Sequence, residues 1–115
     1  MNALYLLSSI CSINKTENFL VLDSGWKSTT MDSGVPSFKD YQNYEFVWGG
    51  DEHSMVKSPC LEKFPLNLED FKLDQKIWLI PGHCDPTVNL HDFIIGVRDG
   101  VVEKIFEVDC RGPGF

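Results

Sequence analysis

The chain has 115 residues, of which 43% are hydrophobic and 23% are charged, a composition typical of one globular domain and unlike that of a disordered segment. Seventeen acidic residues face ten basic ones, and the formal net charge of −7 repels phosphate backbones and anionic lipid headgroups, with no Lys/Arg cluster to offset it. We therefore exclude nucleic acids and membranes as partners.

The first apolar run, Ala3 to Ile13, has the length of a signal peptide. No Lys or Arg precedes it, however, and no small-residue cleavage site follows it. We interpret it as a buried strand and expect a cytoplasmic protein. The four cysteines form no Cys-x-x-Cys pair, which argues against a thiolate zinc knuckle.

Short apolar runs separated by turn residues follow, and this pattern predicts many strands and little helix. A helical turn is expected near residues 68–71. Further strands are expected at residues 18–22, 44–48, 52–57 and 76–80.

The clearest local signal lies near the end of the chain. Asp99 and Gly100 join two β-rich runs, residues 93–98 and 101–108, and Asp-Gly between such runs predicts a hairpin with a type I′ turn. The fold class expected for residues 1–115 is therefore all-β, a single compact antiparallel β-barrel or sandwich of about six to seven strands.

One segment, Pro81 to Asp92, combines groups that bind metals. His83 and Asp85 are two residues apart, and in extended backbone such residues point to the same side. Pro86 favours extended backbone at Asp85. An imidazole and a carboxylate converging on one ion leave positions open for water or substrate, as a Lewis-acid site requires. Mixed nitrogen and oxygen ligation suits Mn²⁺, Zn²⁺, Co²⁺ or Mg²⁺.

His-x-Asp spacing also arises by chance, so a histidine in an ordinary surface turn is the alternative. The wider sequence adds a resemblance. Residues 81–92, P-G-H-C-D-P-T-V-N-L-H-D, closely resemble the metal-binding segment of D-threonine aldolases, which share a fold with metal-dependent D-serine dehydratases and, more distantly, alanine racemase. Residues 22–36 resemble the family's Asp-Gly-Lys block, and residues 50–53 resemble its acidic-acidic-His block. Residues 96–112 resemble its closing hairpin.

The resemblance implies a two-domain enzyme with an N-terminal (β/α)8 barrel and a C-terminal metal-binding β-domain. The barrel carries pyridoxal phosphate and its Schiff-base lysine, and such a barrel takes roughly 250 residues. The chain of 115 residues corresponds to the C-terminal domain alone. The metal ligands implied are His83 and Asp85. No catalytic residue is assigned to this chain, because Lys27 does not match the Schiff-base lysine, and no cofactor-binding residue is named.

The function implied is that of a lyase which cleaves 3-hydroxy-D-amino acids, such as D-threonine to glycine and acetaldehyde. Asp85 favours the aldolase branch, because the dehydratase branch has cysteine at the second ligand position. A dehydratase-type deaminating lyase domain and a non-catalytic remnant β-module are the alternatives. The expected partners are the barrel in cis or in trans, a small D-amino acid and a second copy in a homodimer.

The remaining polar residues have weaker expectations. Asp51, Glu52 and His53 are candidates for hydrogen bonding to a metal-bound histidine or for contacting substrate. Asp23 and Asp32 each precede a Ser-Gly pair, and we interpret both as turn-stabilising residues.

Overall fold

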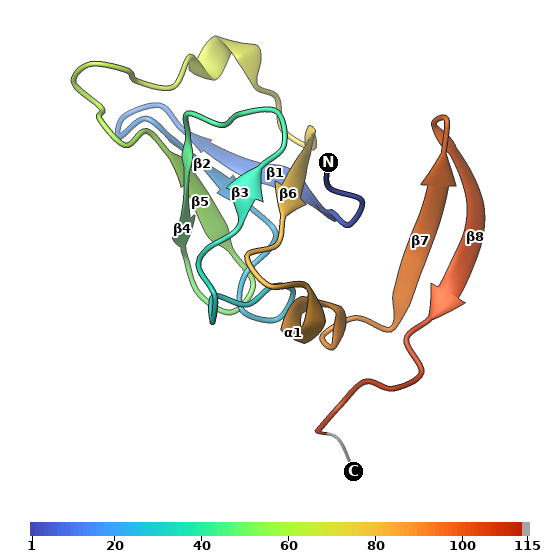
Figure 1. The fold of residues 1–115 in the computed structure, drawn as a ribbon. Coiled ribbons are helices and arrows are strands. Elements are labelled where there is room, and N and C mark those ends of the chain that lie inside the picture. The colour runs from blue at the N-terminus through green and yellow to red at the C-terminus, as the bar shows by residue number, and fades with distance from the viewer. Residues whose placement is uncertain (114–115) are drawn as a thin grey trace.

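The computed structural model describes residues 1–113. Its main body is an antiparallel sheet with the strand order β3-β6-β1-β2-β5-β4, whose edge strands β3 and β4 contact each other and so nearly close a barrel (Figure 1). The strands are β1 (Leu6–Asn14), β2 (Phe19–Leu22), β3 (Ser37–Phe38), β4 (Glu45–Trp48), β5 (Ser54–Lys57) and β6 (Lys76–Ile80). The all-β fold class expected from the sequence is confirmed.

Alternation along the strands builds the core. In β2, Leu20 and Leu22 are fully buried while their neighbours are only partly buried, because successive side chains of a strand point to opposite faces. The same pattern places Ile77 and Leu79 of β6 in the interior. Among residues 1–113, the buried apolar cluster is Ile10, Leu20, Leu22, Phe38, Phe46, Val56, Leu66, Phe71, Ile77 and Leu79.

Two short elements were not expected from the sequence. β3 has only two residues, and it lies in a polar stretch where only Pro36 and Phe38 are buried. Helix α1 (Cys84–Val88) forms in the middle of the metal-segment motif, with Pro86 in its first turn, where a missing N–H costs nothing. The helical turn expected near residues 68–71 is confirmed as a 3₁₀ turn, η1 (Leu68–Asp70).

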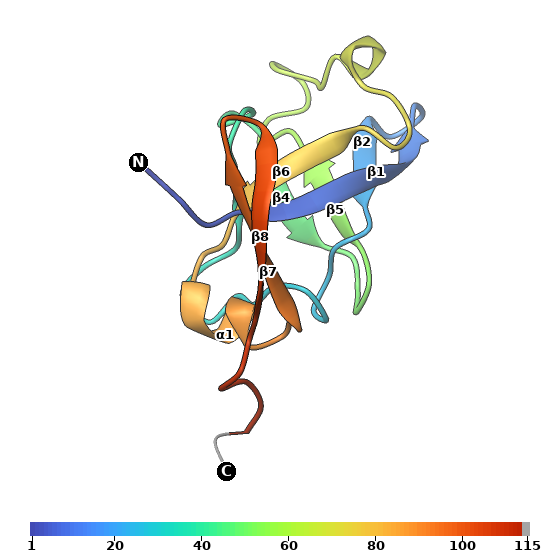
Figure 2. The ribbon, with the colours of Figure 1, turned by 90° about the vertical axis from the view of Figure 1, so that its right-hand side faces the viewer.

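The C-terminal hairpin forms a separate two-stranded sheet made of β7 (Phe93–Arg98) and β8 (Val101–Glu107). Both turn residues have positive φ, 50° at Asp99 and 77° at Gly100, as a type I′ turn requires. The hairpin stands beside the main sheet, with α1 near its base (Figures 1 and 2). No helix among residues 1–113 is long and apolar enough to cross a membrane.

Candidate metal centre

The predicted motifs meet at one end of the main sheet. Strands β2, β4 and β6 end there and β1, β3 and β5 begin there, because all neighbouring pairs are antiparallel. The segment that follows β2 binds the loop between β4 and β5 through its backbone. Trp26 N donates to the Gly50 carbonyl at 3.3 Å, and Lys27 N donates to the Asp51 carbonyl at 2.9 Å.

Two glycines allow these loops to touch. A Cβ on Gly25 would lie 2.4 Å from the Gly50 carbonyl oxygen, and one on Gly82 would lie 2.2 Å from the Gly34 carbonyl oxygen. Real Cβ atoms do not approach backbone this closely, so each contact requires glycine. Each of the two Asp-Ser-Gly turns is therefore seated on one of the histidine-containing motifs, the first before His53 and the second before His83.

His83 lies at the point where β6 leads into α1. It is the N-cap residue, its backbone is extended, and its carbonyl accepts a 2.8 Å hydrogen bond from the hydroxyl of buried Thr87. Its ring nitrogen Nδ1 lies 2.6 Å from Asp32 Oδ2 and 3.4 Å from Ser33 Oγ. The two side chains of the His83–Asp32 pair are 42% and 50% exposed, so the ring is held on one side and open to solvent.

Asp85 has a different backbone from the one expected. It lies in the first turn of α1, not in extended chain, so the argument that residues i and i+2 share a side does not describe this segment. The restraint expected from Pro86 was wrong for the same reason, because proline is accommodated within the first turn. Asp85 is exposed, as is the neighbouring Cys84 thiol, which is not packed in the core.

Charge at this end of the sheet is organised in two pairs. The hydrogen bond from His83, together with a 2.9 Å bond from the Thr30 hydroxyl, lowers the pKa of Asp32 below its usual value. The second pair joins Lys27 Nζ and Glu52 Oε1 at 2.7 Å, and their hydrogen bond lowers the pKa of Glu52 and raises the pKa of Lys27.

The Asp51-Glu52-His53 block is placed beside Lys27. Glu52 pairs with Lys27, and within residues 1–113 the side-chain partners of His83 are Asp32 and Ser33, not members of this block. All three residues of the block are exposed. Their expected part in metal or substrate binding stays a prediction.

Asp23 and His91, which also lie near these loops, each hydrogen-bond to another group of the chain. Asp23 Oδ1 accepts hydrogen bonds from Ser8 Oγ and Ser9 N, both at 2.8 Å, in agreement with a turn-stabilising role. His91 Nε2 lies 2.8 Å from the Ser28 carbonyl, which can only accept, so this nitrogen carries a proton.

The donor chemistry of His83 and Asp85, an imidazole and a carboxylate, suits a divalent cation at a low ligand number. No group of three or more His, Cys, Asp and Glu side chains in the described part of the chain is arranged to hold an ion, so His83 and Asp85 would be two protein ligands at most. A neutral His83 whose Nδ1–H faces Asp32 presents a free Nε2 lone pair, which is the donor that a divalent cation uses.

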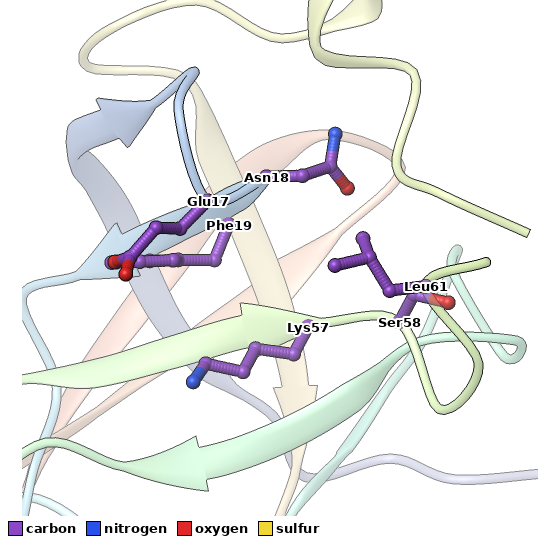
Figure 3. Close-up of a pocket in the computed structure, with 6 residues that line it drawn as sticks. All are labelled: Glu17, Asn18, Phe19, Lys57, Ser58 and Leu61. Carbon is purple, nitrogen blue, oxygen red and sulfur yellow. The ribbon is translucent and has the colours of Figure 1, made fainter.

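A shallow hollow lies elsewhere, lined by Glu17, Asn18, Phe19, Lys57, Ser58 and Leu61 (Figure 3). It is located where β2 begins and β5 ends, which is the opposite end of the sheet from His83. Lys57 Nζ lies 5.2 Å from the Phe19 ring centroid and so covers part of this surface. The hollow therefore does not belong to the candidate centre.

The sequence is similar to a family of enzymes. Residues 3–97 match the model of the family described as "Putative serine dehydratase domain". The chain is 38% identical over 114 residues to a 3-hydroxy-D-aspartate aldolase of Paracoccus denitrificans, and 36% identical over 111 residues to a D-threonine aldolase of an Arthrobacter species. These alignments cover 99% and 96% of the chain but only 27% of each relative. The chain thus spans about a quarter of their length.

The fold is similar to that of solved enzymes. The crystal structure of D-threonine aldolase from Filomicrobium marinum matches 93% of the chain with a TM-score of 0.76 and 32% identity, over 28% of its own length. The D-threo-3-hydroxyaspartate dehydratase from Delftia sp. HT23 matches 94% of the chain and 32% of its own length with a TM-score of 0.74, but at 14% identity, which shows a shared fold alone.

Proposed function

The chain belongs to the serine dehydratase domain family, and from this premise we propose that it is the metal-binding C-terminal domain of a pyridoxal-phosphate-dependent lyase that cleaves 3-hydroxy-D-amino acids. The reaction proposed is that of D-threonine, which yields glycine and an aldehyde. The observation that carries the metal-binding role is the His83–Asp32 pair, because it leaves Nε2 of a solvent-accessible imidazole free, two residues before an exposed carboxylate, Asp85.

His83 and Asp85 would hold the cation, and the remaining coordination positions would stay open for water and substrate. A divalent cation supplies Lewis acidity toward the hydroxyl oxygen of a 3-hydroxy amino acid. Mn²⁺, Zn²⁺, Co²⁺ and Mg²⁺ all accept a mixed nitrogen and oxygen donor set. The domain's part is to fix the imidazole and to keep this face of the centre accessible.

The rest of the enzyme is proposed to come from a (β/α)8 barrel, in cis or in trans, which would supply pyridoxal phosphate and its lysine. The support is the length of the aldolase relatives, because the segment aligned with this chain makes up only 27% of each of them. Residues 1–115 are taken as one domain of a cytoplasmic enzyme, and no residue in it is assigned to the cofactor. Pyridoxal phosphate supplies an electron sink for cleavage next to the amino group.

An aldolase is preferred to a dehydratase. Both sequence relatives at 36–38% identity carry aldolase names, and one of them is named for D-threonine. The dehydratase comparison rests on 14% identity and therefore supports the fold without its reaction. Asp85 in place of a cysteine ligand agrees with this choice.

Metal binding is tested by thermal unfolding of the purified chain with Mn²⁺ or Zn²⁺ titrated in. An ion that binds the folded state alone stabilises it by about 2.7 kcal/mol at a hundredfold excess over its Kd. We expect a rise in Tm that His83→Ala and Asp85→Ala abolish. The control variant is His91→Ala, whose ring binds the Ser28 carbonyl, and it should retain the rise. The absence of a shift in the wild type at millimolar metal would favour the remnant β-module.

The lyase role is tested by domain exchange. The matching C-terminal quarter of the Arthrobacter D-threonine aldolase is replaced by residues 1–113, and release of glycine from D-threonine is measured. We expect activity that depends on added metal and is lost in His83→Ala. A folded chimera that binds pyridoxal phosphate and metal but releases neither glycine nor ammonia would contradict the proposal, and release of ammonia would favour the dehydratase.

A further inference from the structure

Asp32 enters the proposed centre as the hydrogen-bond partner of His83. We infer that Asp32 is a positioning residue: it holds the proton of neutral His83 on Nδ1 and thereby keeps Nε2 available to the metal. This inference rests on the proposed function, because it assigns a task to the same imidazole. It revises the view that Asp32 only stabilises the turn that contains it.

The hydrogen-bond geometry allows one tautomer. Asp32 Oδ2 is 2.6 Å from His83 Nδ1, and an ionised carboxylate can only accept, so Nδ1 must donate and carries the proton of the neutral ring. The other tautomer would place two acceptors face to face and would block Nε2 with a hydrogen. A metal ligand needs the first arrangement, in which the second ring nitrogen is bare.

Asp32 is itself held in place. Its second oxygen, Oδ1, accepts a 2.9 Å hydrogen bond from Thr30 Oγ1, so the carboxylate plane is fixed from both sides. The turn that carries it is closed by a 3.1 Å bond from Gly34 N to the Met31 carbonyl. The carboxylate therefore meets the ring in a defined orientation.

The backbone segments that carry Asp32 and His83 are also in close contact. Gly34 φ is 106°, a conformation that favours glycine, and its carbonyl oxygen lies 2.2 Å from the position that a Cβ on Gly82 would take. Gly82 precedes His83 directly, and the Thr87 hydroxyl binds the His83 carbonyl at 2.8 Å. Gly34 and Gly82, 48 positions apart, are thus fixed against each other next to the ring. A solvated surface ion pair would need none of these supports.

Ser33 provides the matched control. Its hydroxyl is also near His83 Nδ1, but at 3.4 Å, and a hydroxyl can donate or accept and so does not select a tautomer. Removing the Ser33 hydroxyl should leave the proton of the neutral ring on Nδ1. Removing the Asp32 carboxylate should let this proton move to Nε2.

The experiment uses long-range ¹H–¹⁵N NMR correlations of the three imidazoles, at a pH about two units above the ordinary histidine pKa of about 6.5, together with calorimetric titration of Mn²⁺. His91 serves as the internal reference, because its bond to the Ser28 carbonyl requires the proton on Nε2. We expect wild-type His83 and the Ser33→Ala variant to carry the proton on Nδ1. In Asp32→Ala the Nε2–H form should dominate, and the Kd for Mn²⁺ should rise by roughly 10–100-fold.

Asp32→Asn is the second variant, since it keeps the size of the side chain and should also weaken Mn²⁺ binding. Wild-type His83 protonated on Nε2, or an Asp32→Ala variant with an unchanged Kd, would overturn the inference. If the wild type bound no Mn²⁺, the proposed function would fail, and the tautomer comparison would still decide the role of Asp32: a shift on mutation supports it, and an unchanged tautomer overturns it.

Discussion

The main sheet and the C-terminal hairpin differ in what holds them together. The sheet closes around a core in which Leu20, Leu22 and Leu79 are fully buried. The hairpin carries apolar residues of the same kind, but all of them except Ile94 are exposed, for example Ile105 at 59%. Cross-strand partners lie on one face, so Phe93, Ile95, Val97, Val102 and Ile105 form a continuous apolar surface.

The buried core of the main sheet is what orders the loops at its end. A sheet with its own core can hold loops in fixed contact. The His83–Asp32 pair depends on such a contact, because its two residues lie on different loops. An isolated two-stranded hairpin is at best marginally stable in water, and exposed apolar patches of this kind mark interaction surfaces on proteins. The sheet should therefore behave as a cooperative unit, and the hairpin should contribute little to its stability.

The largest effect is expected in the core. Leu79→Ala removes a fully buried side chain from β6, next to β1 and β3, and leaves a cavity. We expect a loss of about 2–5 kcal/mol in the free energy of unfolding, measured by urea titration with tryptophan fluorescence. A loss below about 0.5 kcal/mol would show that the sheet is not the stabilising unit.

The second effect concerns the loops that the sheet supports. Gly25→Ala would place a Cβ 2.4 Å from the Gly50 carbonyl oxygen, so one loop must move. We expect a loss of about 1–3 kcal/mol, as for other overpacked sites, in the same urea titration. Full retention of wild-type stability would mean that the two loops do not hold each other.

The third effect is expected in the hairpin, where the same kind of substitution should change stability little. Ile105→Ala, the counterpart of Leu79→Ala, should change the free energy of unfolding by less than about 0.5 kcal/mol, as surface substitutions do. Val102→Thr combined with Ile105→Thr should lower self-association in analytical ultracentrifugation and the binding of the dye ANS, because it reduces exposed apolar area. If Ile105→Ala lowered the free energy of unfolding as much as Leu79→Ala does, the hairpin would contribute to stability as the main sheet does, and the contrast would be wrong.

The smallest effect comes from the surface pair of Lys27 and Glu52. Because the folded-state pKa of Glu52 is lowered, its contribution to stability is present above the usual value of 4.5 and is lost as the pH falls through the folded value. In a ¹³C NMR titration, Lys27→Met should raise the Glu52 midpoint. Lys63→Met is the control: Lys63 lies between β5 and η1 and forms no salt bridge with Glu52, so the midpoint should stay unchanged. Both groups are exposed, so we expect no measurable change in Tm at neutral pH. An identical Glu52 midpoint in wild type and Lys27→Met would show that the pair does not form.

The sequence predicted the elements that depend on local pattern. The strand at residues 76–80 was placed at its observed bounds, because its apolar run ends at Pro81 and Gly82. The Asp99-Gly100 turn was also confirmed, since its chemistry is local. That the hairpin forms its own sheet could not be predicted, because strand periodicity says which residues alternate and not which sheet they join.

The site was harder to predict. The contact between Asp32 and His83 joins residues 51 positions apart, and it depends on two loops meeting at the end of a sheet. The only signal in the sequence was the repeated Asp-Ser-Gly turn, whose second copy proved to face the imidazole. At Asp85 a local rule was wrong: proline was expected to impose extended backbone and instead sits in the first turn of α1.

The metal centre proposed for this domain is tested by NMR of the isotope-labelled chain with substoichiometric Mn²⁺, whose unpaired electrons broaden nearby resonances. We expect broadening centred on His83 and Asp85, with the loop around Asp32 affected next and the β7–β8 hairpin tip at Asp99 and Gly100 spared. Broadening centred on another acidic surface, or no localised broadening at millimolar metal, would contradict the metal centre proposed for this domain.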